Sequence, residues 1–76
     1  MIVKVRASSL FGNMERSYEF INSVLGRPVT DGNRKIGMIV GYNDTKDLFS
    51  LDIDDDYKDR LMTNEICSCE IVEIIP

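Results

Sequence analysis

The sequence predicts an α+β domain that is mostly β, and three observations predict this class. Several short segments alternate apolar and polar residues with the period of two that half-buried strands show. Residues typical of tight turns separate these segments, and only residues 13–25 carry the apolar period of a helix. About five short strands with glycine bends favour a small, partly open β-barrel or a strongly curled antiparallel sheet. An open α+β sheet is the alternative architecture.

The first predicted strand covers residues 1–7. Its apolar side carries Met1, Val3, Val5 and Ala7. The opposite side carries charges at Lys4 and Arg6, so we expect one side of this strand to face the core and the other to face water.

One α-helix is predicted at about residues 13–25. Asn13 is placed to cap its start, and Gly26 is a typical helix stop. The apolar stripe of this helix consists of Met14, Tyr18, Ile21 and Leu25, widened by Phe20 and Val24. In a chain this short, we expect the stripe to pack on the core. Leu10 and Phe11 are expected to form a turn that leads into the helix.

After the helix the pattern becomes that of strands. Residues 27–30 predict a short strand, and the Asp-Gly-Asn sequence at residues 31–33 is a strong signal for a hairpin turn. In the strand that follows, the apolar side is expected to carry Ile36, Met38, Val40 and Tyr42. Gly37 and Gly41 on its other side predict a bulge or a tight bend.

The C-terminal half predicts two further strands around a short helical turn. The inward side of residues 48–54 is expected to carry Phe49, Leu51 and Ile53. A helical turn at about residues 55–62 follows, with Asp54 or Asp55 as its N-cap. Residues 65–75 predict the last strand, whose alternation shifts near Val72 as at a bulge.

The 76 residues make a single domain, residues 1–76. A domain of this size has a thin stability margin, and self-association is the stabilising addition that this sequence permits most easily. The first residues carry charges within their apolar run, which predicts neither a signal peptide nor a membrane span. We therefore expect a cytoplasmic protein without membrane contact.

The sequence lacks the residues that several kinds of catalysis and ligand binding require. There is no histidine, no Gly-x-Gly-x-x-Gly motif and no phosphate-binding loop that ends in Gly-Lys-Ser/Thr. Cys67 and Cys69 lie two apart in a predicted strand, where a disulfide between them is strained, so we expect buried, reduced thiols. A closed zinc site needs four ligands, which these cysteines supply only in a dimer. We expect no enzyme activity, no cofactor and no bound metal.

Charge is divided unevenly along the chain. Residues 1–38 hold six basic and three acidic residues, a net +3, whereas residues 39–76 hold three basic and ten acidic residues, a net −7. This asymmetry argues against a nucleic-acid ligand and for a protein partner with a basic surface. The candidate partner-binding residues are Asp52, Asp54, Asp55, Asp56, Tyr57 and Asp59. Tyr57 is expected to add the aromatic anchor that charge alone lacks.

Two other interpretations of residues 52–59 stay open. The run can be a strand end and a helix cap whose carboxylates are only solvated. It can also be a loose cation site, although the register of a calcium-binding EF-hand loop breaks at two positions. Tyr57 stands where that loop needs glycine, and Thr63 stands where it needs glutamate.

Residues 26–39 (GRPVTDGNRKIGMI) contain a Gly-x-Pro-Val strand, a polar turn and an Ile-Gly-x-Ile strand. This segment resembles the opening hairpin of PRC-barrel-type domains, which implies a small β-barrel. The compact, acidic, Asn-, Asp- and Ile-rich chain also resembles small accessory proteins of bacteriophages. That resemblance implies a non-catalytic inhibitor of a host protein in the host cytoplasm. The alternatives are a homo-oligomer that sequesters a ligand or builds a virion, and an acidic DNA mimic that occupies a DNA-binding protein.

Overall fold

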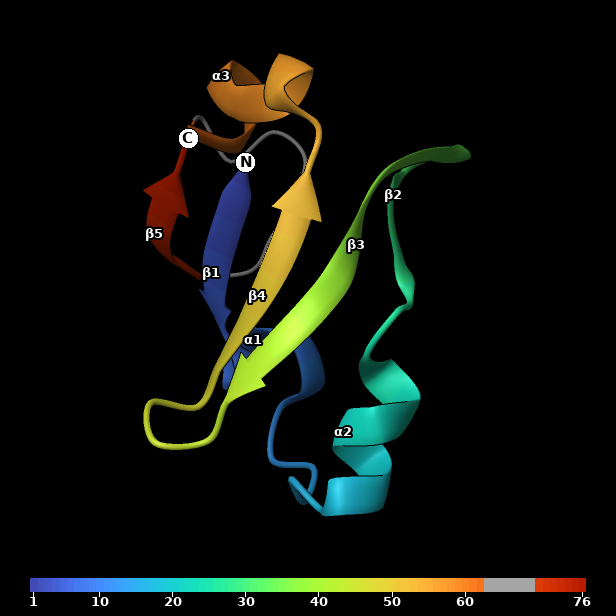
Figure 1. The fold of residues 1–76 in the computed structure, drawn as a ribbon, viewed down its shortest axis with the longest axis vertical. Helices are drawn as coiled ribbons and strands as arrows, with labels where there is room; N and C mark the ends of the chain where they lie inside the picture. Colours follow the sequence, from blue (N-terminus) through green and yellow to red (C-terminus); the bar gives the residue numbers. More distant parts are fainter. Residues whose placement is uncertain (63–69) are drawn as a thin grey trace.

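The computed structural model describes residues 1–62 and 70–76. The first part of the predicted last strand, including Cys67 and Cys69, lies outside these described residues. The described elements are β1 (Ile2–Arg6), α1 (Ala7–Phe11), α2 (Tyr18–Val24), β2 (Pro28–Asp31), β3 (Arg34–Asn43), β4 (Leu48–Ile53), the 3-10 helix η1 (Asp55–Tyr57), α3 (Lys58–Met62) and β5 (Ile71–Ile75) (Figure 1).

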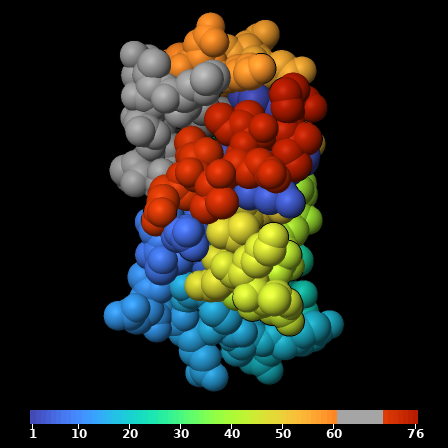
Figure 2. All heavy atoms as spheres, turned by 90° about the vertical axis from the view of Figure 1, so that its left-hand side faces the viewer, coloured from blue at the N-terminus to red at the C-terminus, as the bar shows by residue number. Residues whose placement is uncertain are grey.

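The strands form one antiparallel sheet in the order β2-β3-β4-β1-β5. In the described part of the chain β2 and β5 each pair with a single neighbour, so the sheet is open and not a closed barrel. Figure 2 shows residues 71–76 at the surface on the β5 side of the molecule. The predicted class, a mostly β α+β fold of about five antiparallel strands, is confirmed in its open-sheet form.

The core lies on one face of the sheet, which we call the inner face. The predicted alternation of the central strands is confirmed, because Val3 and Val5 of β1 and Phe49, Leu51 and Ile53 of β4 are buried. Two helices, α1 and α2, pack against this face at one end of the sheet (Figure 1). The opposite face, which we call the outer face, is covered by no described helix.

Four aromatic rings join the helices to the sheet. Phe11 of α1 lies edge-on to Phe20 of α2 at 5.3 Å and to Phe49 of β4 at 5.4 Å between ring centroids. Tyr42 of β3 lies 4.8 Å from Phe49. Such pairs add to the stabilisation that burial of their area already gives. Phe49 of β4 therefore contacts both α1 and β3 in the core.

The predicted helix at residues 13–25 is wrong at its start. Residues 7–11 form a separate helix, α1, which ends at Gly12 with a positive φ of 62°. The next helix begins only at Tyr18, because Ser17 caps it by accepting a hydrogen bond from the backbone N–H of Phe20 at 3.1 Å.

The predicted apolar stripe of that helix is confirmed only for Phe20, Ile21 and Val24. Val24 is fully buried, and Phe20 and Ile21 pack against the core. Tyr18, by contrast, is 82% exposed. The prediction counted residues from a helix start that lies four residues too early, so it placed the exposed Tyr18 in the stripe.

β3 contains the bulge that its glycines predict. Its register with β4 shifts between Ile39 and Gly41, which leaves Val40 as the extra residue. Ile36 is buried as predicted, but at the next positions the predicted alternation is wrong, because Ile39 is buried whereas Met38 and Val40 are exposed. The bulge then returns Tyr42 to the inner face.

Two further local predictions are confirmed. The hairpin between β2 and β3 turns at Gly32 and Asn33, where Gly32 has φ 62°, as a two-residue turn with glycine in first place requires. The register between β1 and β5 pairs Lys4 with Glu73 but Val5 with Ile71, so Val72 is the extra residue of a bulge. Within the described residues, no helix has both the length and the apolar character needed to span a membrane.

Candidate functional site

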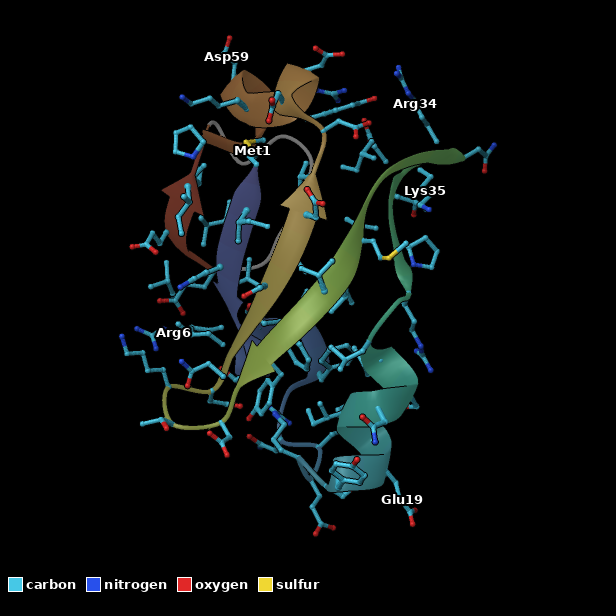
Figure 3. The ribbon with its side chains drawn as sticks, in the orientation of Figure 1. Met1, Arg6, Glu19, Arg34, Lys35 and Asp59 are labelled. Atoms are coloured by element: carbon cyan, nitrogen blue, oxygen red, sulfur yellow. The ribbon has the colours of Figure 1, made fainter. Side chains whose placement is uncertain are left out.

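The predicted carboxylates gather at one end of the molecule, where β4 runs into η1 and α3. This group, which we call the acidic end, consists of Asp52, Asp54, Asp55, Asp56 and Asp59. All five residues are exposed, and Figure 3 shows Asp59 directed away from the body of the protein. The helical turn predicted at about residues 55–62 is confirmed, and it carries Asp55, Asp56 and Asp59, whereas Asp52 lies on β4 and Asp54 links the strand to the turn.

Asp54 stands at the N-cap position of η1 but makes no capping hydrogen bond through its side chain. The predicted N-cap position is therefore confirmed, but the Asp54 carboxylate does not cap the turn by a hydrogen bond. In the part of the chain that the structure describes, neither Asp54 nor Asp56 forms an ion pair. Both carboxylates are left to solvent.

The first residue of the sequence contacts the acidic end. The ammonium group of Met1 donates hydrogen bonds to the carbonyl oxygen of Ile53 at 2.9 Å and to Oδ1 of Asp55 at 2.8 Å, and it lies 3.8 Å from Oδ1 of Asp52. The hydrogen bond with Asp55 raises the pKa of the ammonium group and lowers the pKa of the Asp55 carboxyl. Asp55 thus has a partner within the chain, which its place in the sequence does not indicate.

Tyr57 does not serve as an exposed anchor, and this prediction is wrong. Its side chain is only 6% exposed and belongs to the same core cluster as Ile36 and Ile53. The guanidinium groups of Arg34 and Arg60 lie 5.4 Å and 5.7 Å from the centre of its ring. Tyr57 therefore closes the core beneath the acidic end.

Basic groups also lie at this end of the molecule. Arg60 donates a hydrogen bond from Nη1 to Oδ2 of Asp31 at 2.8 Å, which links α3 to β2. Lys58 stands between Asp56 and Asp59 in sequence. The acidic end is thus a group of exposed carboxylates that basic groups partly neutralise.

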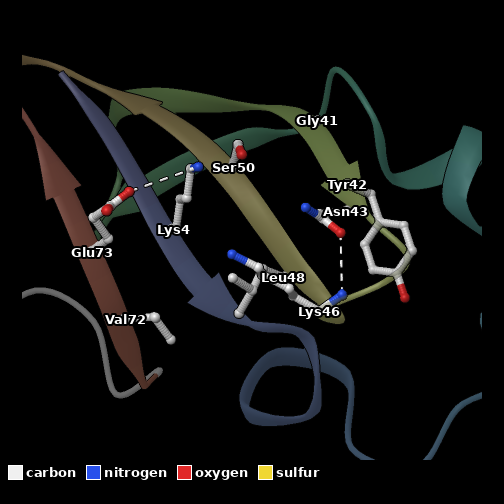
Figure 4. A pocket seen from close by; sticks show the side chains of 9 residues that line it. All are labelled: Lys4, Gly41, Tyr42, Asn43, Lys46, Leu48, Ser50, Val72 and Glu73. Atoms are coloured by element: carbon white, nitrogen blue, oxygen red, sulfur yellow. Dashed lines mark hydrogen bonds and ion pairs between the residues drawn. The ribbon is translucent and has the colours of Figure 1, made fainter.

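A second surface feature lies on the outer face of the sheet (Figure 4). It is a hollow of ≈ 380 Å³ lined by Lys4, Gly41, Tyr42, Asn43, Lys46, Leu48, Ser50, Val72 and Glu73. Lys4 forms a long ion pair with Glu73, at 3.7 Å between Nζ and Oε1. Oδ1 of Asn43 accepts the backbone N–H groups of Thr45 and Lys46, which shapes the loop at its rim. No motif in the sequence indicates this hollow, which arises from outward residues of four strands.

A cluster around Asp47 fixes the loop between β3 and β4. Asp47 has a positive φ of 54°, and its carboxylate accepts hydrogen bonds from the Tyr42 hydroxyl at 2.5 Å and from Nε of Arg16 at 3.2 Å. Its carbonyl oxygen accepts the backbone N–H of Ala7 at 3.0 Å. The hydrogen bond to Asp47, followed by burial, raises the pKa of Tyr42. Sequence reasoning missed this cluster because Arg16 lies 31 residues from Asp47 and Ala7 lies still farther away in sequence.

The raised pKa of Tyr42 gives a test of this cluster. The hydrogen bond to Asp47 stabilises the folded state fully at pH values below about 10, the ordinary tyrosine pKa, and is lost as pH rises through the raised pKa of Tyr42. We expect phenolate absorbance of the folded protein to show a tyrosine that titrates above its ordinary range. Tyr42→Phe should remove that step and lower the free energy of unfolding at neutral pH by about 1 kcal/mol.

The matched control is Tyr18→Phe, because Tyr18 is exposed to solvent. This variant should keep both the high-pH step and the stability of the wild type. Loss of the step in Tyr18→Phe, or its persistence in Tyr42→Phe, would contradict the assignment.

Among residues 1–62 and 70–76, no three His, Cys, Asp or Glu side chains are grouped so that they could hold a metal ion. No protein-family model, curated protein or solved structure matches the chain. The resemblances to PRC-barrel-type domains and to bacteriophage accessory proteins therefore stay predictions.

Proposed function

We propose that the chain is a non-catalytic binding protein that engages a basic protein surface through the acidic end. The observation that carries this proposal is the exposure of five carboxylates on one short segment, among which Asp54 and Asp56 have no ion-pair partner in the described residues. Unpaired surface carboxylates attract a basic partner at long range and so raise the association rate. A small inhibitor of a host factor in the cytoplasm is the form of this function that we favour.

The burial of Tyr57 limits the expected mode of binding to attraction between charges. With the ring in the core, the acidic end offers charge without an aromatic anchor. Binding through exposed charges alone weakens as salt screens the field, over a distance of about 8 Å at physiological ionic strength. We therefore expect an association that is fast and strongly dependent on salt.

A charge-reversal experiment tests this function. The double variant Asp54→Lys/Asp56→Lys changes carboxylates that form no ion pair with residues 1–62 or 70–76, so its free energy of unfolding should stay within about 0.5 kcal/mol of the wild type. Proteins of the native host are captured on the immobilised wild type and on the variant at low and at high salt. We expect a captured basic protein on the wild type at low salt and its loss on the variant.

The matched control is Glu15→Lys/Glu19→Lys, which makes the same change in net charge at exposed positions near the start of α2. This variant should capture the same protein as the wild type. Equal capture by the acidic-end variant would refute the proposed contact surface. An excess of duplex DNA in the same capture distinguishes a DNA mimic, because only that function requires DNA to compete for the captured protein.

A further inference from the structure

The outer face of the sheet carries a group of exposed apolar side chains. Side chains alternate along a strand, and directly paired residues of neighbouring strands share a face, so residues next to inward residues or paired with outward ones belong to this face. Met38 pairs with Asp52, Ile75 pairs with Ile2, and Val40 and Val72 are the extra residues of the two bulges. These four apolar side chains, Met38, Val40, Val72 and Ile75, are 37–47% exposed.

The charges on this face have both signs and lie side by side. Lys4 pairs with Glu73, and Nε of Arg6 donates to Oε1 of Glu70 at 2.9 Å. Lys46 extends across the hollow without an ion pair among the described residues (Figure 4). A face that carries both charges beside apolar groups avoids the like-charge repulsion that a face of a single sign meets on a copy of itself.

The size of the face fits an interface between two subunits. The molecule measures 33 Å and 23 Å along its two longer axes, and Figure 1 looks down the third and shows the sheet broadside. That outline includes the helices, so roughly 760 Å² is an upper limit for the outer face, which places it at or below the about 800 Å² per partner of a standard interface. A chain of 76 residues also buries only about 60% of its unfolded surface alone, so burial of a second face stabilises it.

We propose that the outer face binds a second copy of this chain, so that two sheets pack face to face in a symmetric dimer. The arrangement is that of a β-sandwich, in which side chains of two sheets interdigitate across about 10 Å. The hollow of ≈ 380 Å³ gives room for apolar side chains of the second copy beside Val72 and Leu48. Asp52 lies on the outer face, so it borders this interface, whereas Asp54, Asp55, Asp56 and Asp59 follow β4 and stay available in the dimer.

Sedimentation of the purified chain tests the dimer. Standard interfaces of this area have dissociation constants in the micromolar range or tighter, so at about 100 µM we expect a species of twice the 8.7 kDa chain mass. The variant Val40→Glu/Val72→Glu places two carboxylates in the interface and should raise the dissociation constant at least tenfold. Its circular dichroism spectrum should stay that of the wild type, because both side chains are exposed in the monomer.

Two controls separate the possible outcomes. Met14→Glu/Tyr18→Glu adds the same charge at exposed apolar positions outside the outer face and should stay dimeric, as should Asp54→Lys/Asp56→Lys. Ile75→Lys, at the end of β5, replaces the first variant if that variant fails to fold. A wild type that sediments as a monomer, or a folded outer-face variant that remains a dimer, overturns the proposal. Neither result bears on capture of a basic protein by the acidic end.

Discussion

Gly37→Ala is expected to lower the free energy of unfolding by about 3 kcal/mol. A Cβ atom at Gly37 of β3 would lie 2.2 Å from the carbonyl oxygen of Asp52 and 3.0 Å from Cα of Ile53 on β4. These are backbone atoms, so relief of the overlap requires the two strands to separate at a paired position. Urea unfolding followed by circular dichroism measures the loss as a lower midpoint.

Gly41→Ala is the matched control on the same strand. The nearest atom to its added Cβ is Cβ of Ser50 at 3.8 Å, an ordinary van der Waals contact. Alanine also reduces the conformational freedom of the unfolded chain, so this variant should be neutral or more stable by about 0.5 kcal/mol. Equal destabilisation by the two substitutions would show that the close approach at Gly37 is not the cause.

Phe49→Ala is expected to cost about 3–5 kcal/mol. The side chain is fully buried, and its ring contacts Phe11 and Tyr42, so truncation leaves a cavity where β4, β3 and α1 meet. A 76-residue domain has a total stability of roughly 4–11 kcal/mol at about 0.05–0.15 kcal/mol per residue. We therefore expect a large fraction of this variant to be unfolded at room temperature.

Tyr18→Ala is the control for loss of an aromatic ring. Tyr18 is 82% exposed, and its removal should change the free energy of unfolding by less than about 0.5 kcal/mol. The circular dichroism spectrum and urea midpoint of both variants decide the comparison. A Phe49→Ala variant as stable as Tyr18→Ala would contradict the central place of Phe49 in the core.

The parts of the fold that the sequence predicts are those set by neighbouring residues. β1 alternates over its whole length and β4 alternates from Phe49 to Ile53, so their inward residues follow from the period of two. The Gly-Asn turn and the bulge after Ile39 likewise follow from local preferences of glycine. The open or closed form of the sheet depends on pairing between distant strands, and the local pattern is the same for both.

The start of α2 was missed because two local signals compete there. Asn13 and Ser17 are both N-cap residues, and the apolar period fits either start. The contacts of Arg16 favour the later start, since its guanidinium group donates to the carbonyl oxygens of Gly12 and Met14 and to Asp47. These hydrogen bonds keep residues 12–16 out of the helix. One of them depends on Asp47, which lies 31 residues from Arg16 and gives no local signal.

The candidate site likewise has features that neighbouring residues predict and features that depend on contacts between distant residues. Exposure of the carboxylates was predictable, because Asp52 and Asp54 alternate with buried residues of β4 and the others lie on a short polar turn. The burial of Tyr57 was not predicted, although the spacing of one helical turn between Tyr57 and Leu61 indicates an inward face. The ammonium contact with Asp55 joins residues 54 positions apart and has no local signal.

Binding through the acidic end is tested most directly by amide hydrogen exchange of the chain, alone and in complex with the basic protein that it captures. Exchange of this kind reports which backbone amides a partner protects. We predict slower exchange in the complex at residues 54–59, with no change in α2. Protection confined to α2 or to the outer face of the sheet, with residues 54–59 unchanged, would contradict the acidic end as the contact surface.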